Sequence, residues 1–79
     1  MSFELYSDVI VTRDIDEGLH AGDVGTVVER HDIRGMAEVG YSVEFFDMTG
    51  NTVAVVTVPA SALRAPTRQD RPAARALSA

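Results

Sequence analysis

The carboxylates best placed for chemistry lie in an acidic stretch, "DIDEG", which runs from Asp14 to Gly18. Asp14 and Asp16 are two positions apart, a spacing found in calcium-binding loops, and Glu17 follows. An EF-hand loop also needs a glycine at its sixth position and a glutamate at its twelfth, where this chain has Leu19 and Gly25. We therefore expect no calcium site, and we interpret Asp14, Asp16 and Glu17 as a solvated acidic loop that contacts a partner.

The two histidines, His20 and His31, are the other candidate metal ligands. Zinc requires three or four closely spaced ligands, and the chain has no cysteine to supply them. A zinc site would depend on carboxylates from Asp23, Glu29 or Asp32. We expect no metal and no other cofactor.

Nucleophilic catalysis needs a serine or similar group beside a base that a third residue orients. The serines of this chain have no recognisable motif around them; they are Ser2, Ser7, Ser42, Ser61 and Ser78. A small barrel also fills its interior with side chains and leaves no cleft of useful volume. The sequence therefore predicts a protein that is not an enzyme.

Charge divides the chain of 79 residues into two parts. Residues 1–65 carry eleven acidic side chains and four arginines, whereas residues 66–79 carry three arginines and one aspartate. An acidic body repels phosphate backbones, so nucleic acid is an improbable partner and a basic protein is favoured. The sequence has no leader-like or membrane-spanning run, and its cations are all arginine, as in GC-rich bacteria. We expect a bacterial, cytoplasmic protein with no membrane contact.

Short apolar runs separated by turn residues predict an all-β domain. The expected strands are 7–14, 24–31, 41–46 and 51–58, and a single 3-10 turn over "PASAL" precedes a short fifth strand at Leu63 and Arg64. Five strands of this length favour a small SH3-like barrel over residues 1–65, closed or half-closed, rather than a sandwich.

Glycines punctuate the turn before the second strand, in "GLHAGDVGTVVER". Gly22 and Asp23 are expected to form the turn, and Gly25 to permit either a bulge or a close approach of strands. Val24, with Val27 or Val28, is expected to line the core. No helix follows this turn, so it offers no helix N-terminus for a phosphate.

Alternating residues of "YSVEFF" place Tyr41, Val43 and Phe45 on one face of a strand, and Ser42, Glu44 and Phe46 on the other. Glu44, Phe46 and Val56 are predicted to form an apolar patch with an acidic rim that binds a partner. Alternatively, Glu44 pairs across the hairpin and Phe46 completes a second small core. Residues 51–58 are apolar on both faces, which predicts burial on both sides or an edge that pairs with a partner or with a second copy.

The last residues, 66–79, are expected to be a disordered, flexible tail rich in arginine, proline and alanine. A short helix that forms on a partner is the alternative. Arg68, Arg71 and Arg75, together with Arg64, recur every three or four residues and would form one stripe on a helix. Such a stripe would contact an acidic partner, a nucleic acid or the acidic barrel of this chain.

Two segments, "SDVIVTRDIDEGLHAGDVGTVVER" and "YSVEFFDMTGNTVAVVTVPASALR", carry a family resemblance over residues 3–64. The chain resembles a family of small bacterial domains of unknown function with the patterns GD.GTVVE and VEF.D..G.T.A. It is more distantly similar to KOW domains and to the β-subunit barrel of nitrile hydratase. These resemblances imply an SH3-like barrel, and the first is loosely associated with two-gene modules that include antitoxin-like proteins.

Two functional hypotheses follow. The first is a non-enzymatic protein-interaction module, an antitoxin-like or accessory subunit that binds a basic partner through its acidic loop, the patch at Glu44, Phe46 and Val56, or a sheet edge. The second is a KOW-like nucleic-acid or ribonucleoprotein accessory that uses Arg68, Arg71 and Arg75.

Overall fold

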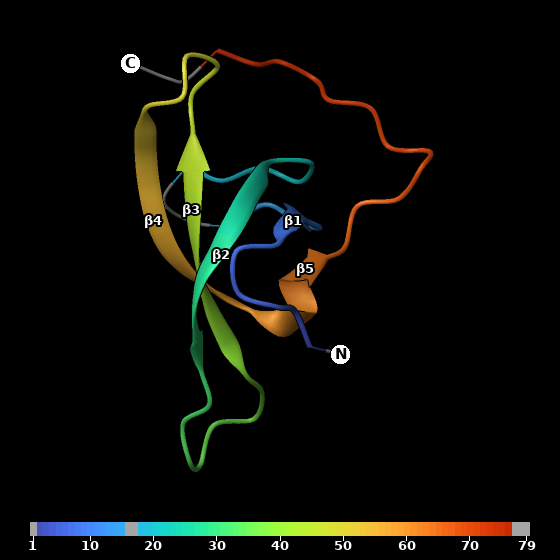
Figure 1. Ribbon diagram of the computed structural model, residues 1–79. Coiled ribbons are helices and arrows are strands. Elements are labelled where there is room, and N and C mark those ends of the chain that lie inside the picture. The colour runs from blue at the N-terminus through green and yellow to red at the C-terminus, as the bar shows by residue number, and fades with distance from the viewer. Residues whose placement is uncertain (1, 16–17, 77–79) are drawn as a thin grey trace.

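Five antiparallel strands form one sheet in the computed structural model, which describes residues 2–15 and 18–76 (Figure 1). The strands follow the order β4-β3-β2-β1-β5 across the sheet. Their bounds are Asp8–Val11 for β1, Val24–His31 for β2, Gly40–Phe46 for β3, Thr52–Pro59 for β4 and Leu63–Arg64 for β5. One 3-10 helix, η1, spans Ala60–Ala62 in the described chain.

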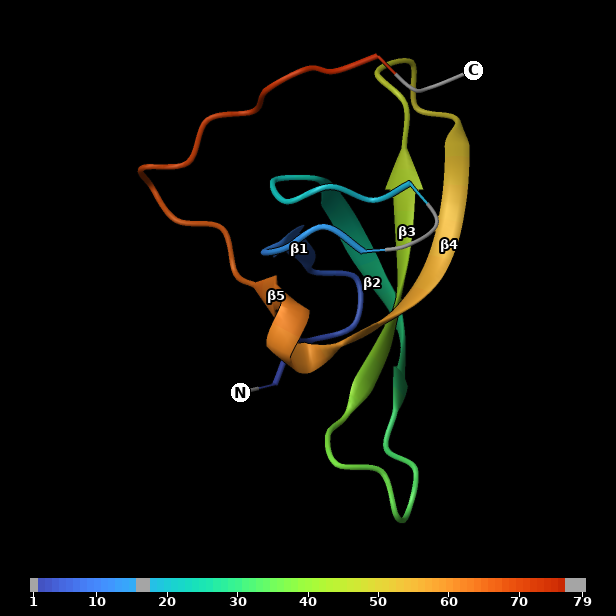
Figure 2. The same ribbon diagram turned by 180° about the vertical axis from the view of Figure 1, so that it is seen from behind.

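The sheet is curved, and its last strand returns to its first (Figures 1 and 2). β4 bends at its end into η1, and this turn brings β5 against β1, where Val11 pairs with Leu63. β4 and β5 lie at the two ends of the strand order, so the barrel is half-closed. The all-β, SH3-like architecture expected from the sequence, with its 3-10 turn before the last strand, is confirmed.

The concave face of the sheet forms the core. Tyr41, Val43 and Phe45 alternate along β3 and are buried, as predicted. The Tyr41 hydroxyl accepts a hydrogen bond from the Phe3 amide at 3.1 Å, and the Phe3 ring packs edge-on against it. Leu19 folds back from its loop onto the same core. Each fully buried side chain of this size stabilises the fold by about 1.5–3 kcal/mol.

One prediction about the core is wrong. Val24 is about half exposed, because Gly25 and Val27 take the inward positions of β2 and Val24 alternates outward. All three apolar residues of β1 are buried, because β1 lies between two strands.

Gly25 provides a close approach of strands and not a bulge. It faces Phe45 on β3 and Val9 on β1, and the bulge of β2 falls later, between Val27 and Glu29. A Cβ at position 25 would lie 2.5 Å from a methyl carbon of Val43 and 2.9 Å from the backbone oxygen of Glu44. The sheet can curve tightly here because this residue has no side chain.

Gly25→Ala should therefore destabilise the domain by about 1–3 kcal/mol, the usual cost of overpacking a core. Gly40→Ala is the matched control, since a Cβ there meets the Thr57 methyl at 3.3 Å and no backbone atom closer than 3.9 Å. Urea unfolding of both variants measures the difference. Equal stabilities would contradict the close approach.

Candidate functional site

β4 is an edge strand with an uncovered outer face. In the described part of the chain it pairs with β3 and with no other strand, so alternate backbone groups along its outer edge have no partner in the sheet. Val53 and Val55 point outward with 42% and 58% of their surface exposed. Such an edge is a template for an added strand.

Glu44 and Phe46 lie on this outer face, next to the valines of β4. Phe46 is 44% exposed, and Glu44 stands opposite Val55 in the register of the two strands. The Glu44 carboxylate accepts a hydrogen bond from the Thr52 hydroxyl, which holds it across the hairpin. An apolar surface with an acidic residue therefore exists as predicted, but its valines are Val53 and Val55 instead of Val56.

Val56 does not belong to that surface, and this part of the prediction is wrong. Val56 pairs with Val43 and packs against the core. The strands change register between Phe45 and Phe46, where one extra residue is inserted in β4. A one-residue shift moves every side chain of a strand to the opposite face. Val53 is the inserted residue, and Val55 and Thr57 take the outer positions that an unshifted hairpin gives to Ala54 and Val56.

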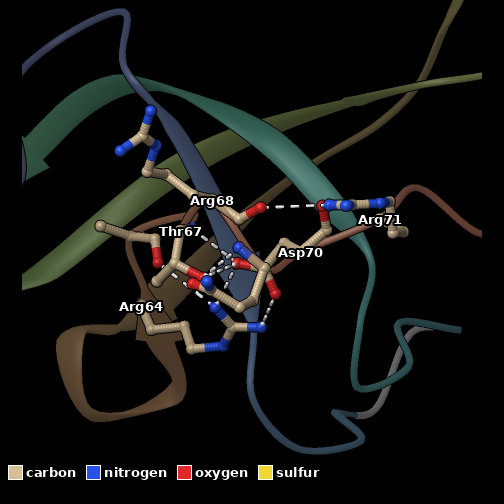
Figure 3. Close-up of polar contacts among 7 residues, drawn as sticks. Arg64, Thr67, Arg68, Asp70 and Arg71 are labelled. Carbon is tan, nitrogen blue, oxygen red and sulfur yellow. Dashed lines mark hydrogen bonds and ion pairs between the residues drawn. The ribbon is translucent and has the colours of Figure 1, made fainter.

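The tail is attached to the barrel near its base by an ion pair between Arg64 and Asp70 (Figure 3). The two nitrogens of the Arg64 guanidinium donate to the two carboxylate oxygens at 2.7 and 2.8 Å. Asp70 also accepts the amide of Thr67 at 2.6 Å. The guanidinium, with the Thr67 amide as the next cause, holds the pKa of Asp70 well below its ordinary value.

Beyond this ion pair the tail is extended. Residues 65–76 contain neither helix nor strand, as expected, and the helical arginine stripe does not form in them. Arg71 donates to the carbonyls of Arg68 and Asp70 within the tail itself. The Arg68 side chain points away from this cluster (Figure 3).

Arg75 returns to the barrel and forms an ion pair with Asp23. Of the three contacts that the sequence left open for the tail arginines, this is the one with the acidic barrel of the same chain. The Nε of Arg75 donates to Oδ1 of Asp23 at 2.9 Å and its Nη2 to Oδ2 at 2.6 Å. The same Nη2 donates to the carbonyl of Gly18 at 3.0 Å. Burial, the largest single effect, raises the pKa of Asp23, but hydrogen bonds from Arg75 and the His20 amide together outweigh it and lower that pKa.

The turn that presents Asp23 is tied to β1. Gly22 adopts a φ of +97° and donates its amide to Val11, whose own amide donates to the Asp23 carbonyl. Asp23 Oδ2 also accepts the His20 amide at 2.9 Å. Asp14 closes the loop by accepting the amide of Ala21 at 3.0 Å. Of the predicted acidic loop, Asp16 and Glu17 lie outside the described residues.

An open groove of about 470 Å³ lies between this turn, the β3–β4 hairpin and the tail. Its apolar lining includes Leu19, Val24, Phe46, Met48 and Val53, and the tail contributes residues 72–75. A second open groove of about 450 Å³ lies near the β2–β3 hairpin, beside Ile33, Met36 and Pro59. Both grooves are open to solvent, whereas the interior of the barrel is filled by buried side chains.

His31 lies apart from this site, and His20 contributes its backbone amide to it. His31 Nε2 is 2.7 Å from the Ser42 hydroxyl and 3.7 Å from a carboxylate oxygen of Glu29. Across residues 2–15 and 18–76, no group of three metal-ligating side chains comes together. No helix in those residues is long and apolar enough to cross a membrane.

The strand order, the 3-10 turn and the curled sheet define a small all-β domain of the SH3-like class. The chain belongs to the family described as Domain of unknown function (DUF4926), whose sequence model matches residues 5–65. That range covers the barrel and ends where the tail begins. Neither the curated proteins nor the solved structures gave a match.

Removal of the Arg75 guanidinium should raise the pKa of Asp23. In Arg75→Ala the largest of the interactions that lower this pKa is lost. The stabilisation by this contact is present above the ordinary aspartate pKa and is lost as the pH falls through the lowered one. A carbon-13 NMR titration of the carboxyl group measures the shift. Arg68→Ala is the control, and the same pKa in both variants would contradict the contact.

Proposed function

We propose that this protein is a non-catalytic interaction domain, an antitoxin-like or accessory subunit, that binds a basic protein partner along β4. The observation that carries the proposal is the uncovered edge of β4 together with the exposed side chains of Val53, Val55 and Phe46 beside it. An extended segment of the partner adds to the sheet as a further strand. Backbone hydrogen bonds supply affinity in this binding mode, and the side chains of one face supply specificity.

Charge supports a basic partner over a second copy of the chain. Residues 1–65 have a large excess of acidic side chains, and Glu44 lies on the binding face itself. Two copies paired through β4 would bring two acidic barrels together, which disfavours association at low salt. A basic partner gains from the same charge through faster encounter.

Charge and side-chain pairing also disfavour the nucleic-acid alternative. Arg64 and Arg75 donate to carboxylates of this chain, so binding a phosphate with either would require breaking an ion pair. The remaining tail arginines stand against an acidic body. We therefore prefer a protein partner to RNA or DNA.

A photo-crosslinking amino acid at position 55 should capture a basic protein in the native host, through a contact that weakens as salt rises. Position 33 is the matched control, because Val55 and Ile33 are both 58% exposed and apolar while Ile33 lies outside β4. Crosslinked products identified by mass spectrometry should be specific to position 55. A further substitution, Thr57→Lys on the same face, should reduce the yield.

Identical products from positions 55 and 33 would overturn the proposal, as would no product from position 55. A crosslinked dimer of the chain as the main product would replace the basic partner with a second copy. A product that contains RNA or DNA would favour the nucleic-acid alternative instead.

A further inference from the structure

We propose that the turn from Gly18 to Asp23 and the groove beside it recognise an arginine in an extended segment of the partner. Arg75 of this chain occupies the acceptors of the turn until the partner displaces it. The inference rests on the proposed function and deepens it, because it names the group of the basic partner that is recognised. The groove shares Phe46 and Val53 with the proposed β4 interface but does not include Val55, so measurements at position 55 and at Asp23 test the two proposals separately.

The acceptors of this site match a guanidinium and not simply a positive charge. One side of the Arg75 guanidinium spans both oxygens of Asp23, while its Nη2 also reaches the Gly18 carbonyl. A planar guanidinium presents several donors in a rigid arrangement, whereas a lysine ammonium is a compact charge. The geometry therefore selects arginine over lysine.

The acceptors are held in place by contacts that do not involve the tail. Asp23 is positioned by its backbone bonds with Val11 and His20 and by the bond from the His20 amide to its carboxylate. A site built in this way keeps its shape when the tail leaves, so an incoming arginine finds it preformed.

A narrow extended chain runs along one side of the groove beside the turn. Residues 72–75, Pro-Ala-Ala-Arg, line it together with apolar side chains of the β3–β4 hairpin. Proline and alanine have little side chain, so the segment can lie close to that surface while the arginine reaches Asp23. The tail shows which sequence delivers a guanidinium to the turn: small residues followed by an arginine.

The occupant is held weakly enough to leave. Among residues 71–76, the hydrogen bonds to the barrel come from the Arg75 side chain, and no backbone bond joins this part of the described tail to a strand. The Arg75 side chain is 36% exposed. An ion pair this exposed favours the state in which the tail is docked over the state in which it is released by a factor of about five at most.

A labelled peptide, acetyl-RPAARA-amide, which copies residues 71–76, tests the site by fluorescence anisotropy with the full-length protein. It should bind Arg75→Ala about fivefold more tightly than the unmodified chain, because the internal competitor is gone. Arg68→Ala removes a tail arginine without touching the site and should bind the peptide as the unmodified chain does. Asp23→Asn in the Arg75→Ala background should lose most of the binding.

The peptide with Arg75→Lys tests the same contact without altering the protein, so the result holds even if Asp23→Asn fails to fold. Weaker binding of the lysine peptide supports the site. Equal binding of the two peptides, or no gain in Arg75→Ala over Arg68→Ala, overturns the inference. A dimer of the unmodified chain that Arg75→Ala abolishes, seen by sedimentation velocity, would show that tails are exchanged between copies and would also overturn it.

If the peptide fails to bind while the crosslink at position 55 persists, the arginine site is wrong and the β4 interface stands. If the peptide binds with the expected pattern while position 55 gives no product, the arginine site stands and the interface proposed along β4 is wrong.

Discussion

The structure depends on one constraint: a single sheet, with no second layer, must bury its own apolar face. It does so by curving until β5 meets β1, which encloses Tyr41, Val43 and Phe45. Curvature needs strands to approach closely, and Gly25 allows β2 and β3 to do this without a clash. Among the described residues, no second sheet or helix covers the convex face. Exposed apolar residues on that face are thus a consequence of the architecture as well as a candidate interface.

Because β4 is the edge strand, the exposed apolar residues of the convex face can form a binding surface. As the edge of the sheet it combines unpaired backbone groups with outward valines, whereas β1 at the other side is covered by β5. The register shift near Phe46 determines which valines face outward. A shift of this kind also increases local twist. The interaction surface therefore arises from topology and a single extra residue rather than from a sequence motif.

The same elements show what the sequence can and cannot predict. The alternation of Tyr41, Val43 and Phe45 identifies the core because polar residues stand between them. β4 has apolar residues on both faces, so alternation cannot tell its inner face from its outer one, and Val56 was misplaced. Asp23 and Arg75 are 52 positions apart, and no periodicity links them. Their charges made docking of the tail on the barrel one alternative among three, but only the fold brings this pair together.

The ion pair between Arg64 and Asp70 determines how strongly the tail competes for the arginine site. It anchors the chain at Asp70, which is five positions from Arg75, whereas Arg64 is eleven positions away. A shorter tether raises the effective concentration of its end, commonly into the millimolar range. The partner competes with the tail for the arginine site. It displaces the tail when its concentration, relative to its dissociation constant, exceeds the effective concentration of Arg75 relative to the dissociation constant of the tail. The tail therefore favours partners that engage β4 and the arginine site together, since contact at one surface offsets the cost of displacing Arg75 at the other.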